Sequence, residues 1–236
     1  MLFRSTVDLG VWENLGQMGF AASLGGLRAL VAGITYMRAY VAFENVEWAQ
    51  VDSLFQLTSR LQPRDVSYWD EAAWHMAYNA ASNYLHSDRV EPIMRGKLYH
   101  SHIERGIQIL EDGLRFNPED PRLLSRLGDI YAKRKIEPQK AGEIYERVSR
   151  LEGLRRYERF AAYEYLKTAD RALWRKAYDL LKASYDREGP KYPAVVDGIK
   201  ELEKRLGIPF IQWIPEKSSG RGQLQPPQPM DLPATR

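Results

Sequence analysis

The sequence predicts an all-α protein of stacked helical hairpins that ends in an extended, proline-rich tail. Three observations predict this class: apolar residues recur at helical spacing, one pattern of offsets occurs four times, and the last 29 residues lose that periodicity. The chain has 236 residues, of which 44% are hydrophobic, so it is long enough to bury a continuous core. It contains no cysteine, which excludes disulfides and thiolate chemistry.

The repeated pattern marks the second helix of each hairpin. Four segments carry small or apolar residues at offsets 0, 4 and 7, which lie on one face of a helix, and a Pro or Gly at offset 12, where the helix must end. Small residues at these positions allow the neighbouring helix to approach closely. The four sets are Val51, Phe55, Thr58 and Pro63; Gly106, Leu110, Gly113 and Pro118; Ala141, Tyr145, Val148 and Gly153; and Ala177, Leu181, Ser184 and Gly189.

Three first helices carry a bulky residue, then a large and a small residue as a pair, then another bulky residue. The first repeat is degenerate, with Arg38 and Ala39 in place of the pair. This arrangement makes a ridge with a notch into which a neighbouring helix packs. In the stretch FNPEDPRLLSRLGDIYAKRK, Pro118 closes one hairpin and Pro121 begins the next helix. The sets are Trp69, Ala72, Ala73 and Met76; Leu124, Leu127, Gly128 and Tyr131; and Tyr157, Phe160 and Ala161, with Glu164 where an apolar residue is expected.

The spacing of the second helices defines the organisation of the chain. Their starts lie 55, 35 and 36 residues apart. Two steps are close to one period, and the first contains an insertion of roughly 20 residues, which we place in the connection of the second hairpin at 85–101. We expect an N-terminal arm at 1–24, a solenoid of about four hairpins plus a capping helix at 25–207, and the tail at 208–236.

The hairpin pattern resembles that of the tetratricopeptide-repeat family, of bacterial type. That family has an aromatic residue, Leu-Gly, Tyr, and then Ala, Phe, Ala and a closing Pro, with a period near 34 residues. The best match is LLSRLGDIYAKRKIEPQKAGEIYERV at 123–148, with PRDVSYWDEAAWHMAY and LEDGLRFNPEDP in support. The resemblance implies a tetratricopeptide-like, right-handed helical-hairpin solenoid whose first helices line a concave groove that binds peptides or other proteins.

The resemblance also indicates which side chains face the groove. Arg122 and Arg126 lie one helical turn apart and either hold a carboxylate by paired hydrogen bonds or form a solvated basic face. Family members that clamp a peptide's C-terminal carboxylate pair such basic residues with Asn, whereas this chain has Asp70 and Trp74, so a different ligand is expected. The groove residues are Asp70, Trp74 and Tyr78 from one repeat, and Arg122, Arg126, Asp129 and Lys133 from the next.

Charge is distributed unevenly along the chain, although the net charge is only +3. Residues 1–121 carry a net −5, residues 122–207 a net +7 and the tail +1, so the two halves attract different partners or one another in a neighbouring copy. An RNA-binding helical-repeat protein is therefore the alternative to a protein-binding one. The aromatic residues interleaved with the basic half are Tyr157, Phe160, Tyr163, Tyr165, Trp174 and Tyr178.

The least charged stretch of the chain is residues 15–43, in which Arg28 and Arg38 are the only charged residues. Its uninterrupted apolar runs are shorter than the roughly 18 to 20 residues that a membrane-spanning helix needs. We interpret the stretch as a buried first helix of the domain, with a helix on a membrane surface or against a partner as the alternative. No cleavable signal peptide is evident, which favours a cytoplasmic or membrane-peripheral location.

The sequence predicts no catalytic, cofactor or metal site. His100 and His102 lie two residues apart, so on a helix they point away from each other and form a poor metal pair. The Gly pairs lack the Lys and the strand-to-helix setting of phosphate-binding loops. We therefore expect a non-enzymatic interaction scaffold, an accessory or structural subunit of a larger assembly, with peripheral membrane contact as an option.

The tail at 208–236 has no helical period and contains six prolines, a composition typical of an extended segment. Its start includes the apolar sequence FIQWIP, in which Phe210 and Trp213 are the largest side chains. We expect these two residues to anchor the tail in the assembly.

Overall fold

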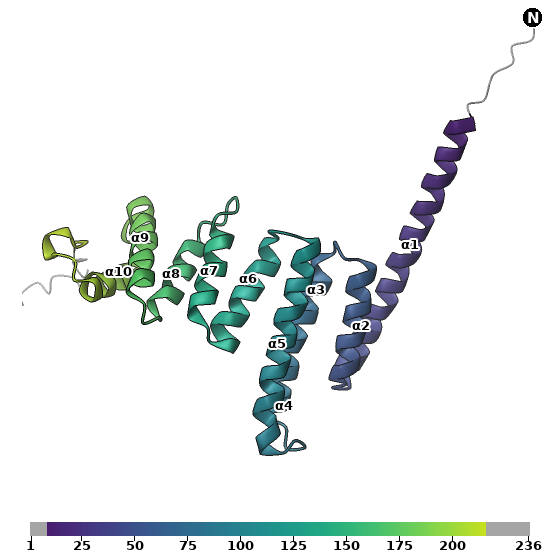
Figure 1. Cartoon of the computed structure of the whole chain (residues 1–236), viewed down its shortest axis with the longest axis horizontal. Helices are drawn as coiled ribbons and strands as arrows, with labels where there is room; N and C mark the ends of the chain where they lie inside the picture. Colours follow the sequence, from purple (N-terminus) through teal and green to yellow (C-terminus); the bar gives the residue numbers. More distant parts are fainter. Residues whose placement is uncertain (1–8, 216–236) are drawn as a thin grey trace, which may run out of the picture.

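The computed structural model describes residues 9–215, with side chains from residue 24 onward, and every regular element within them is a helix or a helical turn. Figure 1 shows the helices in order along the chain. They are α1 (Leu9–Glu44), α2 (Trp48–Leu61), α3 (Val66–Trp74), the π-helical turn η1 (His75–Ala80), α4 (Ala81–Leu85), α5 (Pro92–Phe116), α6 (Pro121–Ile130), the π-helical turn η2 (Tyr131–Lys135), α7 (Pro138–Ser149), α8 (Tyr157–Leu166), α9 (Arg171–Glu188), the 3₁₀ turn η3 (Gly189–Lys191), α10 (Pro193–Leu206) and the 3₁₀ turn η4 (Phe210–Gln212).

The helices form a row in which each packs against its neighbours in the sequence (Figure 1). α1 pairs with α2, the continuous α3–η1–α4 run pairs with α5, α6–η2 pairs with α7, and α8 pairs with α9. α1 lies at one end of the row and α10 at the other (Figure 1). The prediction of an all-α protein of sequentially packed helix pairs is therefore confirmed for the described residues.

Aspartate residues fix the starts of three helices. The carboxylates of Asp65, Asp120 and Asp170 accept hydrogen bonds from backbone N–H groups two or three residues further on, at the beginnings of α3, α6 and α9. These N–H groups have no partner inside the helix, so the caps stabilise it by about 1 kcal/mol each. Pro121 lies in the first turn of α6, where its missing N–H costs nothing. The sequence FNPEDP is thus a junction between helix pairs, as predicted.

Glycines allow close packing where the notch pattern predicts it. A Cβ atom at Gly128, in α6, would lie 2.7 Å from Cε1 of Tyr145, in α7. A Cβ atom at Gly106, in α5, would lie 2.9 Å from the backbone oxygen of Ala73, in α3. Since real Cβ atoms do not approach other atoms this closely, a larger residue would displace the Tyr145 ring at position 128 and the backbone of the neighbouring helix at position 106.

One face of α1 is packed against the rest of the row. Ala32 and Ala39 are fully buried against it, and the hydroxyl groups of Thr35 and Thr58 share a buried hydrogen bond of 2.8 Å between α1 and α2. The Tyr36 hydroxyl donates to Glu71, in α3, at 2.7 Å. Among the described residues, no helix is both long enough and apolar enough to span a bilayer.

Two predicted boundaries differ from the structure. The inserted residues 85–101 do not form a long connection, because α4 and α5 continue through most of them and leave only residues 86–91 between the helices. The ends of α4 and α5 therefore project from the row (Figure 1). The predicted boundary at residue 24 falls inside α1, which runs without interruption from Leu9; residues 1–8 of the predicted arm lie outside the described residues.

The chain after α10 folds back onto that helix. Ile214 is buried, and its backbone N–H donates to Oε1 of the fully buried Glu203 at 2.8 Å. Of the predicted anchors, Phe210 is 77% exposed, and Trp213 is half-buried and donates from Nε1 to the oxygen of Ile208 at 2.8 Å. The buried contact is thus made by Ile214. Residues 216–236 of the predicted tail lie outside the described residues.

Candidate functional site

Three of the predicted groove residues form one ionic cluster between α3 and α6. Asp70 is only 3% exposed. Nε of Arg126 lies 2.6 Å from its Oδ1, and Nε of Arg122 lies 2.7 Å from its Oδ2. The hydrogen bond to Asp70 raises the pKa of Arg126 above its usual value. The two arginines are therefore held by a carboxylate of their own chain, and a ligand carboxylate would have to compete with it.

Trp74 and Tyr78 line a hollow of about 590 Å³, which we call the first hollow. The end of α1, the start of α2, the α3–η1–α4 run and one residue of η2 surround it. Trp74 is 40% exposed, and the Arg134 guanidinium lies 4.4 Å from the centre of the Tyr78 ring. The hollow is lined by Phe43, Glu44, Val46, Trp48, Trp74, Tyr78, Asn79, Ser82, Asn83 and Arg134.

Some polar groups that line the first hollow are already hydrogen-bonded to other residues of the chain. Trp48 donates from Nε1 to Oδ1 of Asn83 at 3.0 Å, and Arg134 donates from Nη2 to the Ser82 hydroxyl at 3.1 Å. The Asn83 amide nitrogen makes no hydrogen bond within the described part of the chain, and the buried Nε of Arg134 also has no acceptor there. The exposed Asn83 amide is thus a donor available in the first hollow, whereas Nε of Arg134 is buried.

His75 is a core residue next to the first hollow, and it packs against Phe43, which lines the hollow. It is buried, and its ring centre lies 4.5 Å from that of Phe43 and 5.4 Å from that of Phe55. Asn79 and His75 are hydrogen-bonded through Nδ2 and Nδ1 at 3.1 Å. Burial lowers the pKa of His75 to about 4, so the ring is neutral at physiological pH. It acts as a packed aromatic residue.

Asp129 and Lys133 line a second hollow, of about 350 Å³, between α6–η2, α7 and α8. The Asp129 carboxylate accepts a hydrogen bond of 2.7 Å from the Tyr145 hydroxyl and pairs with Lys133 at 2.8 Å. Burial, with this hydrogen bond, raises the pKa of Tyr145 far above its usual value, so the hydroxyl stays protonated. Phe160, at the rim, is 44% exposed. The second hollow thus combines an apolar ring with two paired carboxylates, Asp129 and Glu164, the latter 2.6 Å from Lys167.

The two hollows are neighbours along the first helices. Lys133 lines the second hollow and Arg134, the next residue in η2, lines the first. A single helical turn therefore contributes to both hollows.

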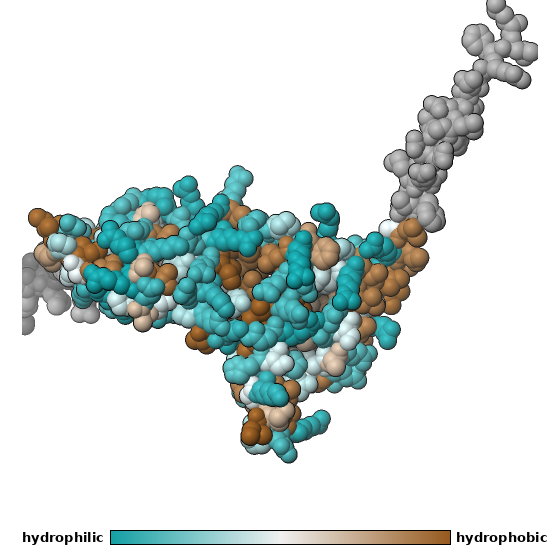
Figure 2. Space-filling view, in the orientation of Figure 1, coloured by the Kyte–Doolittle hydropathy of each residue, from teal (hydrophilic) through white to brown (hydrophobic). Residues whose placement is uncertain are grey.

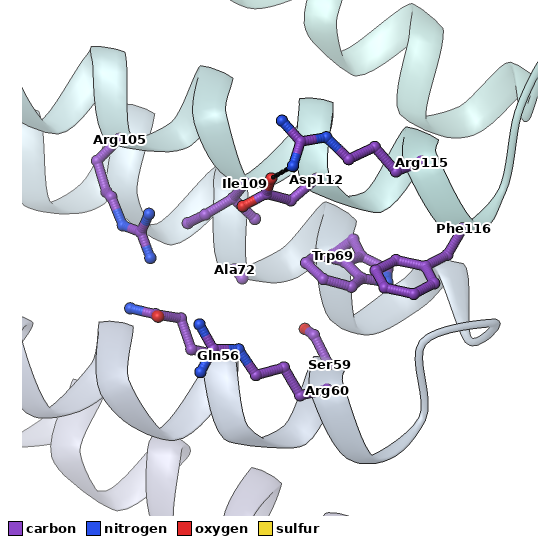
Figure 3. Close-up of a pocket in the computed structure, with 10 residues that line it drawn as sticks. All are labelled: Gln56, Ser59, Arg60, Trp69, Ala72, Arg105, Ile109, Asp112, Arg115 and Phe116. Carbon is purple, nitrogen blue, oxygen red and sulfur yellow. Dashed lines mark ion pairs between the residues drawn. The ribbon is translucent and has the colours of Figure 1, made fainter.

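A third cavity, of about 310 Å³, lies between α2, α3 and α5 and contains none of the predicted groove residues. Figure 3 shows Trp69 and Phe116 with their rings face to face, and Arg60 and Arg105 reaching in from α2 and α5. The two rings stack with centres 5.9 Å apart. Arg105 and Arg115 are already paired with aspartates. The third cavity is thus similar in volume to the second hollow, and two of its three arginines are neutralised by ion pairs.

Sequence reasoning missed Asn79, Asn83 and Arg134 as lining residues. Each is polar and follows a predicted groove residue by one to five positions. A regular α-helix would place Asn79 away from the groove, but the π-helical turn η1 shifts the helix register. For Asn79 and Arg134, the sequence signal was a polar residue directly after a predicted groove residue.

The aromatic residues that suggested RNA binding have mixed positions. Tyr165 and Tyr178 are buried in the core, and Trp174 donates from Nε1 to the oxygen of Thr168 at 2.8 Å. Tyr163 and Phe160 line the second hollow. In the part of the chain that is described, no group of three His, Cys, Asp or Glu residues is arranged to hold a metal ion.

A scan of the sequence against models of known protein families finds no match, and a search of curated proteins finds no significantly similar sequence.

Proposed function

We propose that this protein is a non-enzymatic scaffold of the tetratricopeptide type, a right-handed solenoid that binds an extended segment of a partner protein along its first helices. In this role it serves as an accessory or structural subunit of a larger assembly. The observation that carries the proposal is the pair of neighbouring hollows on either side of Lys133 and Arg134, lined by aromatic and amide side chains that no described element covers.

The chemistry of the hollows supports a peptide as the ligand. Sites for peptides and small molecules combine apolar walls with a few oriented polar groups. In the first hollow, Trp74 and Val46 offer apolar surface, and the Asn83 amide can donate to a peptide carbonyl group. In the second hollow, Phe160 offers the apolar surface and Lys133 the charge. A partner segment with an apolar residue for each hollow fits this arrangement.

The packing of the helix pairs supports the tetratricopeptide type. The pair Leu127 and Gly128 stands in a first helix, and the ring of Tyr145 in the following second helix fills the space that the glycine leaves. Ala72 and Ala73 hold the same place in the preceding pair, against Gly106. In both pairs a small residue of the first helix lies against the following second helix, as the tetratricopeptide pattern expects.

The test is a selection of peptides from a random displayed library on the full-length chain, followed by affinity measurement with variants. We expect Trp74→Ala and Phe160→Ala each to weaken the selected peptide by about tenfold or more, as buried aromatic anchors do. Phe116→Ala is the matched control, because this ring is also about half exposed but lines the third cavity.

Two outcomes would contradict the proposal. One is that no peptide is enriched over an unrelated helical protein. The other is that Phe116→Ala abolishes binding while Trp74→Ala and Phe160→Ala do not, since the third cavity would then be the site.

A further inference from the structure

The outer face of α1 is apolar and uncovered. Figure 2 shows it as a cluster of hydrophobic atoms at the end of the row. Terminal elements of repeat arrays normally present a polar outer face, and large apolar patches on a protein surface usually mark interaction sites. The large side chains of this face, between 37% and 66% exposed, are Leu27, Leu30, Val31, Ile34, Met37 and Val41.

Five of these residues have the spacing of a coiled-coil seam. Leu27, Leu30, Ile34, Met37 and Val41 follow one another at steps of three, four, three and four residues. We call these five residues the α1 seam. This spacing is the one by which a helix packs against a single partner helix. Leu24, Val31 and Tyr40 add exposed apolar surface beside the seam.

The seam is free for such a partner because the opposite side of α1 is the side that packs against the row. Ala32 and Ala39 lie halfway round the helix from the seam and are fully buried. The seam therefore points away from α2 and from the rest of the row. Gly26 and Gly33 border the seam, and a Cβ atom at either position would have nothing within 4 Å. A second helix can thus approach the α1 backbone closely.

We propose that the α1 seam is the interface of a homodimer, in which α1 of one copy packs against α1 of a second copy across a two-fold axis. A two-fold interface requires a surface that is complementary to itself, which a continuous apolar seam is. Arg28 and Arg38 are the only charged residues between Glu13 and Glu44, and neither is in the seam, so pairing buries no charge at its centre. The dimer does not depend on peptide binding and would carry two peptide sites.

A lipid surface is the other occupant that an apolar helix with two arginines fits, and the vesicle experiment below distinguishes it from a second copy. The tail of the chain is a poor candidate. Residues 216–236 contain four prolines, and they follow α10, at the other end of the row. Proline interrupts a helix, so this segment cannot supply a matching helical seam.

Sedimentation velocity and light scattering on the full chain, at low and high micromolar concentrations, test the dimer. We expect a mass twice that of the 27.3 kDa chain, and a monomer for Ile34→Glu, with unchanged helical content by circular dichroism. Leu57→Glu is the control, because Leu57 is 45% exposed on α2, outside the seam, and this variant should remain dimeric. A monomeric wild-type chain at every concentration, or a dimeric Ile34→Glu variant, would overturn the proposal.

The absence of cysteine allows a second test. Single variants Leu30→Cys, Ile34→Cys, Met37→Cys and Val41→Cys are oxidised, and at least one should form a disulfide-linked dimer, whereas Leu57→Cys should not. Equal cross-linking of Leu57→Cys would count against the seam. Sedimentation of the wild-type chain with phosphatidylcholine–phosphatidylglycerol vesicles should show no binding, and binding that Ile34→Glu removes would overturn the dimer in favour of a lipid surface.

Discussion

Asp70 of α3 and Arg126 of α6 are joined by a bond of 2.6 Å between Oδ1 and Nε, which links the first helices of two successive pairs. Arg122 occupies the other carboxylate oxygen, so one buried acidic group holds two arginines. A charge in the interior is stable only when it is paired and hydrogen-bonded. This cluster therefore sets the distance between the helices that carry the first and second hollows.

Replacement of Asp70 by alanine should be strongly destabilising. Asp70→Ala leaves two guanidinium groups without their shared acceptor, and since both are partly exposed we expect a loss of about 2 to 3 kcal/mol in the free energy of unfolding. Urea denaturation followed by circular dichroism measures it. Asp186→Ala, which removes an exposed pair with Lys182, is the control and should cost under about 0.5 kcal/mol. Equal losses for the two variants would contradict the role of Asp70.

Two glycines of α5 should respond oppositely to alanine. Gly106→Ala forces a Cβ atom against the backbone oxygen of Ala73 and should destabilise the protein by about 2 kcal/mol. Gly96 has nothing within 4 Å of a built Cβ atom, so Gly96→Ala should stabilise the helix by up to about 1 kcal/mol. Thermal unfolding of both variants checks the signs. A stabilising Gly106→Ala would show that α3 and α5 are not closely packed there.

Stability should decline in mild acid because of His75. The unfolded chain takes up a proton at this residue near pH 6.5, whereas burial lowers the folded-state pKa to about 4. The free energy of unfolding should therefore fall as the pH drops from 6.5 towards 4, with a contribution of up to about 1.4 kcal/mol per pH unit. His75→Phe cannot titrate and should reduce this slope in urea denaturation between these pH values. An unchanged slope would assign the acid sensitivity to other groups.

Alanine substitution of the two tryptophans of α3 should distinguish a residue that stabilises the fold from one that is available for binding. Trp69 is 6% exposed and donates to the oxygen of Pro63, so Trp69→Ala should cost about 3 to 5 kcal/mol. Trp74 is 40% exposed and its indole Nε1 makes no hydrogen bond within the described residues, so Trp74→Ala should cost only about 1 kcal/mol. Chemical denaturation of both variants measures the difference. Comparable losses would mean that Trp74 is chiefly a packing residue.

Truncation should locate the end of the stable fold. A chain that ends at Pro215 keeps the contact between Ile214 and Glu203, and its melting temperature should match that of the full chain. A chain that ends at Pro209 loses it and leaves a buried carboxylate without this donor, which should cost about 1 to 3 kcal/mol. If the two truncated chains melt at the same temperature, Ile214 does not stabilise α10.

The fold class and the buried faces of the second helices could be predicted because they depend on local periodicity. Gly106, Gly113 and Gly128 were recognised from their offsets, and each faces a neighbouring helix at close range. The lengths of α4 and α5 could not be predicted, because residues 85–101 have no strong helical period, and helix and loop are then decided by packing between the two helices. Pro92, in the first turn of α5, was the one local signal.

The groove was predictable in part. Trp74 and Tyr78 share a hollow, as the offsets of a regular helix indicate. The pairing of Asp70 with Arg122 and Arg126 depends on the distance between two helix pairs, which a single sequence does not contain. A regular α-helical pattern also fails to predict which side chains face the hollow at η1 and η2, because a π-helical turn contains an extra residue.

The turns His75–Ala80 and Tyr131–Lys135 place this extra residue at the same point in two successive first helices. Deletion of one residue from the former would restore α-helical register and rotate Ser82 and Asn83 by about 100° around the helix axis. The first hollow would then lose the Asn83 amide without any substitution of a lining residue. Insertions and deletions of single residues in these turns offer a route by which ligand preference can diverge between related chains of almost identical composition.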